Sequence, residues 1–158
     1  MHEAWGPYSE TILHFPEASL TIDLRVPVPL DACRTLAGVG LPGPFAVVTS
    51  CNPLGRVLEP RANQRLSAVL AGVVREQHPG AVRADGGAPA GGHLEPGWAL
   101  ATSLEPARRL AARFFQNAVF WFEDGRFSIV PVLAKGPVLA LPRPPAARPP
   151  IHPRTGHP

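Results

Sequence analysis

Proline is the residue that most restricts the fold of this chain. It occupies 21 of the 158 positions, where average usage of about 5% would give about eight. Proline cannot donate a hydrogen bond to a sheet and disrupts a helix interior, so the excess must lie in loops, at strand edges or in a tail. Residues 137–158 hold eight prolines, three arginines and no acidic residue. We therefore expect one domain over residues 1–136, followed by a basic, extended proline-rich tail over residues 137–158.

Two pairs of apolar segments predict β-hairpins. Residues 19–26 alternate between apolar and polar side chains, as a half-buried strand does, and we expect residues 11–15 to pair with them. Residues 118–122 and 127–130 flank Asp124-Gly125, a dipeptide that favours a tight hairpin turn. Further strands are predicted at residues 44–50 and 98–102. The glycine-rich stretch 85–92 is predicted to be a flexible connection.

Helical periodicity is strongest where Leu66, Val69, Leu70 and Val73 recur on one face of a helix. Three helices are predicted, over residues 31–37, over residues 63–75 and after Ser103. Together the patterns predict the α+β class. The expected architecture is a two-layer sandwich of a mostly antiparallel sheet with two or three helices, and an extended proline-rich C-terminal tail.

The charge, the first residues and the hydropathy of the chain indicate which partners and which cellular compartment to expect. The net charge of +3 is modest, and Lys and Arg are spread along the chain rather than clustered as in nucleic-acid binders, so binding of nucleic acid is not expected. The first residues do not resemble a signal peptide. No apolar run approaches the roughly 18 residues that span a bilayer. We expect a cytoplasmic protein, with attachment to a membrane-bound complex as an open alternative.

Three short motifs resemble one family. They are Thr49-Ser50-Cys51-Asn52-Pro53 at a strand end, Asn63-Gln64-Arg65-Leu66 in a helix start, and Phe114-Phe115-Gln116-Asn117-Ala118 before a strand. Over about residues 8–125 the chain resembles the domain-of-unknown-function 3293 family of small bacterial proteins. The resemblance implies a shared fold and a shared polar cluster, but no activity. Glu95 precedes Trp98 here, whereas members tend to carry a Trp followed by Glu, so no role is assigned to Glu95.

The motifs contribute one candidate ligand site. Its members lie at strand ends and helix starts, where ligands often bind, and they are Asn52, Asn63, Arg65, Gln116 and Asn117. Amides and a guanidinium are suited to holding a carboxylate or a phosphate. The alternative is that these side chains cap helices and satisfy loop backbone groups.

Neither covalent catalysis nor metal binding has a convincing residue set. Cys51 with His93 as its base is the sharpest catalytic candidate, but nothing in the sequence indicates a lowered thiol pKa or a base within reach. His93 and Glu95 offer two ligands where a closed zinc site needs four. We therefore predict no catalytic residue, no metal and no cofactor.

The tail favours a protein partner. Proline pairs flanked by arginine dock into aromatic grooves of other domains, and the candidate contact residues are Pro142, Arg143, Pro145, Arg148, Pro149 and Ile151. The leading hypothesis is a non-catalytic accessory subunit that docks onto one or more proteins of a larger assembly, with the tail as a strap. The alternative is a small-ligand binder or enzyme that uses the Asn/Arg/Gln cluster.

Overall fold

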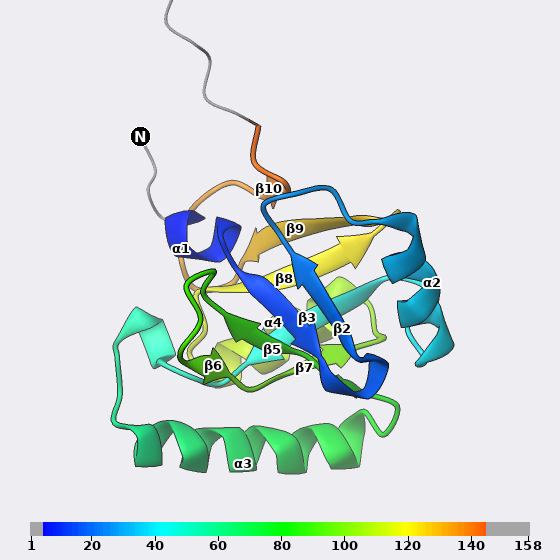
Figure 1. Ribbon diagram of the computed structural model, residues 1–158. Helices are drawn as coiled ribbons and strands as arrows, with labels where there is room; N and C mark the ends of the chain where they lie inside the picture. The colour runs from blue at the N-terminus through cyan, green and yellow to red at the C-terminus, as the bar shows by residue number, and fades with distance from the viewer. Residues whose placement is uncertain (1–4, 145–158) are drawn as a thin grey trace, which may run out of the picture.

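The computed structural model describes residues 5–144 and shows two antiparallel sheets with helices around them (Figure 1). The four-stranded sheet has the order β2-β1-β5-β6, and its strands are β1 (Ile12–Phe15), β2 (Leu20–Asp23), β5 (Asp85–Gly87) and β6 (Leu94–Glu95). The six-stranded sheet has the order β10-β9-β8-β3-β7-β4, and its strands are β3 (Phe45–Thr49), β4 (Val82–Arg83), β7 (Gly97–Leu100), β8 (Ala118–Glu123), β9 (Arg126–Pro131) and β10 (Leu139–Ala140).

Four α-helices accompany the sheets in the described part of the chain. They are α1 (Gly6–Ser9), α2 (Leu30–Gly38), α3 (Pro60–Gln77) and α4 (Leu104–Arg113). Short 3₁₀ turns occur at η2 (Pro16–Ala18) and η3 (Pro53–Gly55). None of the described helices is long and apolar enough to cross a membrane.

Strand β3 divides the interior into two cores. Its side chains alternate, so Phe45 and Val47 face one core while Ala46 and Val48 face the other, as the period-two geometry of a strand requires. The first core lies between the two sheets and includes Leu36 of α2. The second core lies beneath the six-stranded sheet, where α3 and α4 cover it.

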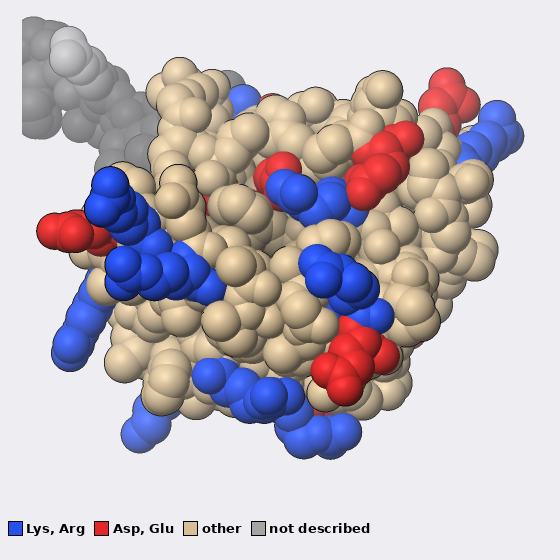
Figure 2. All heavy atoms as spheres, turned by 90° about the horizontal axis from the view of Figure 1, so that it is seen from below, with Lys and Arg blue, Asp and Glu red and all other residues tan. Residues whose placement is uncertain are grey.

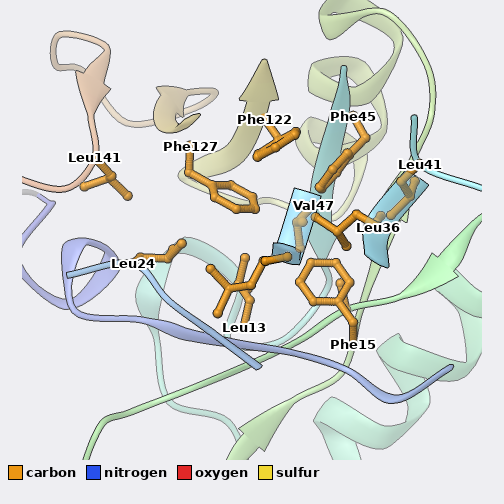
Figure 3. Packing of buried hydrophobic residues seen from close by; sticks show 14 of the residues in the cluster. Leu13, Phe15, Leu24, Leu36, Leu41, Phe45, Val47, Phe122, Phe127 and Leu141 are labelled. Carbon is orange, nitrogen blue, oxygen red and sulfur yellow. The ribbon is translucent and has the colours of Figure 1, made fainter. Parts of the chain in front are cut away.

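Aromatic rings fill the centre of the first core (Figure 3). Phe45 stacks on Phe122 with ring centroids 4.8 Å apart, and Phe127 lies 4.9 Å from Phe122. Leu13 and Phe15 of β1 pack against them from the smaller sheet. Because every one of these side chains is almost completely buried, the β1–β2 hairpin is an integral part of the domain.

The α+β class and both hairpins are confirmed. β1 pairs with β2, and β8 pairs with β9 across Asp124 and Gly125, which both adopt left-handed backbone angles. The predicted helices are present but extend further at both ends, since α2 begins at Leu30 and α3 begins at Pro60. The strands form two sheets rather than one. The smaller sheet therefore covers one face of the larger sheet, and α3 and α4 cover the other.

The prediction of a flexible connection over residues 85–92 is wrong at its start. Residues Asp85–Gly87 form β5, which pairs with β1 on one side and with β6 on the other. Gly86 and Gly87 belong to these pairings because strand pairing uses main-chain groups, which glycine supplies as well as any other residue. Glycine is depleted in strands, so the sequence did not indicate that these residues pair in a sheet.

The start of the proline-rich segment packs against the domain. Leu139 pairs with Ile129 in the sheet, and Leu141 is buried in the first core. The Trp5 indole N–H donates a 3.1 Å hydrogen bond to the main-chain oxygen of Pro137. Residues 139–141, which were predicted from the sequence to belong to the tail, are therefore attached to the domain by one buried leucine and a two-residue strand.

Candidate functional site

Asn52 and Asn63 form a reciprocal pair at the end of β3. The Asn52 main-chain N–H donates to Asn63 Oδ1 at 2.9 Å, and Asn63 Nδ2 donates to Asn52 Oδ1 at 2.8 Å. Asn52 Oδ1 also accepts the main-chain N–H of Leu58 at 3.0 Å, and Asn52 Nδ2 donates to Glu95 Oε1 at 2.9 Å. Asn52 adopts a left-handed backbone with φ 48°, a conformation that asparagine tolerates better than most residues. The pair therefore fixes the path of the loop that runs from β3 to α3.

Gln116 ties the same strand end to the connection between α4 and β8. Its Nε2 donates to the main-chain oxygens of Cys51 at 3.2 Å and of Phe114 at 3.0 Å, and its side chain is buried. Because both side-chain hydrogens point to main-chain acceptors, Gln116 holds two loops together at a fixed distance.

Asn117 is the point where three segments meet. Its main-chain oxygen accepts the N–H groups of Val132 at 2.8 Å and of Ala134 at 3.3 Å. Its side-chain nitrogen lies 3.4 Å from the position that a Cβ atom would take at Gly55. The η3 loop, the α4–β8 connection and the segment after β9 therefore converge at this residue.

Arg65 lies apart from this cluster. It is exposed on α3, whereas Asn63 faces the interior two residues earlier, which is the separation that places two side chains on different sides of a helix. Arg65 takes part in no ion pair among the described residues. The structure therefore brings four of the five predicted residues together, and the prediction that Arg65 joins them is wrong. Ligand binding by the cluster stays a prediction.

The loops held by the cluster carry two strained residues in direct contact. Leu54 and Phe115 have φ angles of 55° and 54°, in the left-handed region that costs a side-chain-bearing residue roughly 1–2 kcal/mol. The Leu54 main-chain N–H donates to the Phe115 oxygen at 2.7 Å. Neither residue is the glycine that normally takes this conformation.

Phe115 occupies a helix-end position that glycine usually fills. The Gln116 N–H bonds the oxygen of Ala111 at 3.1 Å and the Phe115 N–H bonds that of Ala112 at 3.0 Å, which is the Schellman pattern with Phe115 at the left-handed position. Helix α2 ends with the same two bonds, but Gly40 occupies the equivalent position with φ 100°. The chain therefore uses glycine at one such end and phenylalanine at the other.

Four exposed apolar side chains come from the segments that converge at Asn117. We call them the apolar patch, and they are Leu54 (48% exposed), Val57 (89%), Phe115 (57%) and Leu133 (44%). Arg56 lies between the first two along the chain, and Lys135 follows the last by two residues. Neither basic residue forms an ion pair within residues 5–144. Apolar patches rimmed by polar side chains mark interaction sites in many proteins.

Cys51 lies next to this region but is not an activated thiol. Its Sγ is 3.7 Å from Ser67 Oγ. Burial raises the pKa of the Cys51 thiol, and the negative charges of Glu95 and Asp85 raise it further. His93 is exposed and makes no hydrogen bond to Cys51. A nucleophilic cysteine needs a lowered pKa, so the environment of Cys51 is that of a packed, protonated side chain.

Glu95 is the site residue that the sequence did not indicate. It accepts the Asn52 side chain at 2.9 Å. Burial raises the pKa of the Tyr8 hydroxyl, and the negative charge of Glu95 raises it further. The hydrogen bond from Asn52 links β6 of the smaller sheet to the polar cluster at the end of β3.

The predicted partner contacts in the tail are only partly described. Pro142 follows the buried Leu141 and is half-buried, and Arg143 is exposed. Pro145, Arg148, Pro149 and Ile151 lie outside the described residues.

The fold and the polar cluster define a small α+β protein whose three motifs meet at one loop surface, and the comparisons agree with the resemblance. The model of the family described as "Protein of unknown function (DUF3293)" matches residues 48–119. This range begins in β3 and ends in β8, so it contains the whole polar cluster together with Leu54 and Phe115. It is shorter than the range of 8–125 expected from the motifs. Neither the search of curated proteins nor that of solved structures gave a match.

Proposed function

We propose that this chain is a non-catalytic interaction module that docks onto a larger protein assembly through the apolar patch. The C-terminal residues from Pro142 onward act as a second contact, the strap. The observation that carries the proposal is the exposure of Leu54 and Phe115 on left-handed backbone, joined by a 2.7 Å hydrogen bond. Strained backbone tends to persist where it contributes to function.

The energy of this arrangement favours a binding role. Two left-handed residues cost roughly 2–4 kcal/mol together, which is a large part of a total stability of about 5–15 kcal/mol. Leu54 and Phe115 are half-exposed, so packing within the domain returns only part of that energy. A partner that buries both side chains would return the rest, at about 25 cal/mol per Å² of apolar surface.

The polar cluster acts as scaffold in this proposal. The amide groups of Asn52 and Asn63 satisfy one another and the neighbouring main chain, and those of Gln116 satisfy two main-chain oxygens. A ligand would have to displace these bonds, each of which costs about 1–3 kcal/mol when a buried group loses its partner. The cluster is therefore better suited to holding the patch than to binding a small molecule.

Charge selects the kind of partner. Arg56 and Lys135 beside the patch favour a protein surface that combines apolar and acidic side chains. The chain's own tail is basic and lacks acidic residues, so it does not complement this surface. An anionic membrane is a weaker candidate because two basic residues supply only about 2 kcal/mol at such a surface.

Co-purification of the tagged full-length chain from its native cells tests the proposal. The patch variant carries Leu54→Asn and Phe115→Gly, and the matched control carries Val69→Gln, which removes an exposed apolar side chain from the middle of α3. We expect the natural chain and the control to retain the same partner and the patch variant to lose it, although all three stay folded. Deletion of residues 143–158 is expected to weaken retention without abolishing it.

Two outcomes would overturn the proposal. Equal retention of the partner by the patch variant and by the control would show that the patch is not the docking surface. Light scattering measures whether the purified chain self-associates. Self-association that disappears in the patch variant would show that the patch binds a second copy of the chain.

A further inference from the structure

We infer that the groove between the end of α3 and helix α4 binds the anionic group of a small organic molecule. The groove is a shallow depression, open to solvent, with a volume of about 440 Å³, and it is lined by Gln77, His78, Pro106, Arg109, Leu110 and Arg113. No acidic side chain lines it. Pockets of roughly 300–1,000 Å³ hold small ligands, so the volume is sufficient for a metabolite. The inference does not depend on the apolar patch, because no patch residue lines the groove, although Phe115 follows Arg113 by two positions.

Two arginines of α4 supply the positive charge. Arg109 and Arg113 are four residues apart and therefore lie one above the other on the same face of the helix. Neither forms an ion pair within residues 5–144. Like charges at this spacing destabilise a helix by a few tenths of a kcal/mol. A bound anion between the two guanidinium groups would reverse this repulsion.

The neighbouring Arg108 differs from the two arginines of the groove because its guanidinium has partners within the domain. It pairs with Glu105 at 2.7 Å and donates to the main-chain oxygen of Pro131 at 3.2 Å. Arg108 is therefore a structural residue that attaches α4 to β9. The two arginines of the groove have no such engagement.

Helix α3 contributes polar groups and one opposing effect. Gln77 is its last residue and His78 follows, with the His78 N–H bonded to the oxygen of Val74 at 2.7 Å. The end of a helix carries about half a negative charge, which disfavours an anion. Helix α4 ends at Arg113, so its own C-terminus adds a similar partial negative charge. The two full positive charges of Arg109 and Arg113 exceed both partial charges, so the groove stays positive.

An apolar surface accompanies the charges. Pro106 and Leu110 line the groove, and of the two the half-buried Pro106 keeps exposed surface, whereas Leu110 is almost completely buried. The remainder of an organic ligand can pack on Pro106 while its anionic group reaches the arginines. Bidentate guanidinium contacts suit either a phosphate or a carboxylate. Figure 2 shows the underside of the molecule, where Lys and Arg side chains are spread over the surface.

Calorimetric titration of the full-length chain at constant ionic strength tests the inference, with pyrophosphate and citrate as probes. The variants are Arg109→Gln and Arg113→Gln, which keep the aliphatic stems, and the control is Arg65→Gln on the exposed face of α3. We expect saturable binding of one or both probes. Loss of one charged hydrogen-bond donor should weaken it about tenfold, and Arg65→Gln should change it less than about twofold.

The pattern of results decides between the outcomes. Binding of pyrophosphate alone assigns the groove to phosphates, and binding of citrate alone assigns it to carboxylates. Absence of saturable binding for both probes overturns the inference. Equal weakening by Arg65→Gln also overturns it, because it would show diffuse attraction by the basic surface. Thermal unfolding shows whether each variant is folded. If Arg113→Gln is unfolded, the binding result for Arg109→Gln alone decides the outcome.

Discussion

The main-chain N–H of Leu54 donates a 2.7 Å hydrogen bond to the main-chain oxygen of Phe115, and both residues have left-handed backbone. Sixty residues of sequence separate them, yet the end of β3 and the end of α4 meet at this bond. Asn52, Asn63 and Gln116 hold the two loops around it. The proposed function depends on this contact, because it presents two apolar side chains to solvent in a fixed arrangement.

Replacing Phe115 with glycine should leave the domain at least as stable as the natural chain. Glycine removes roughly 1 kcal/mol of left-handed strain, which offsets the packing lost with a ring that is 57% exposed. The matched change is Gly40→Ala at the same position of α2, where φ is +100° and no atom lies within 4 Å of the new Cβ. It should destabilise by about 1–2 kcal/mol. Urea unfolding measures the free energy of unfolding of both variants. A decrease of more than about 2 kcal/mol for Phe115→Gly would contradict the idea that Phe115 is strained.

Asn63→Ala should lower the free energy of unfolding by about 1–3 kcal/mol. The change leaves the Asn52 N–H without its acceptor, and an unsatisfied buried group carries that penalty. Arg65→Ala, two residues further along the helix, should change stability by less than about 0.5 kcal/mol. Chemical denaturation compares the two variants. A harmless Asn63→Ala would show that the reciprocal pair does not hold the loop.

The stability of the domain should fall at alkaline pH. The pKa of the Cys51 thiol in the folded chain is raised above its ordinary value of 9.0, first by burial. Between the unfolded and folded pKa values the unfolded chain binds fewer protons, so unfolding becomes easier as pH rises. The contribution to stability is complete below the unfolded pKa and is lost as the pH rises through the higher folded pKa. Unfolding measured at increasing pH should therefore show a steeper decline for the natural chain than for Cys51→Ala.

Truncation should locate the end of the domain after Leu141. A chain ending at residue 144 keeps β10 and the buried Leu141, so it should unfold at the same denaturant concentration as the full chain. A chain ending at residue 136 loses both and should be destabilised by about 2–5 kcal/mol, the cost of removing a buried leucine. Equal stability of the two truncated chains would place the domain boundary at residue 136.

Periodicity predicted the parts of the fold that local sequence determines. The alternation in residues 19–26 and the turn residues Asp124 and Gly125 predicted two hairpins because strand pairing between neighbours needs only local information. The division of the strands into two sheets was not predictable in the same way. It depends on β5 pairing with β1 across seventy residues, and the glycines of β5 carry no apolar pattern that indicates a strand.

The candidate site was predictable where side chains serve the main chain. Asn52, Asn63, Gln116 and Asn117 are polar residues at element ends, and these are the positions where amides satisfy loop backbone groups. The apolar patch had no such signal, because a left-handed backbone at Leu54 or Phe115 contradicts the preferences of both residue types. Such conflicts between local preference and fold are expected at functional sites.

Hydrogen exchange of the chain, free and within the assembly that co-purifies with it, measures whether a partner covers the apolar patch. We expect amides in residues 53–58 and 114–117 to exchange more slowly in the assembly, since a docked partner covers the patch. Unchanged exchange in both segments, with slowing confined to another surface, would contradict this expectation.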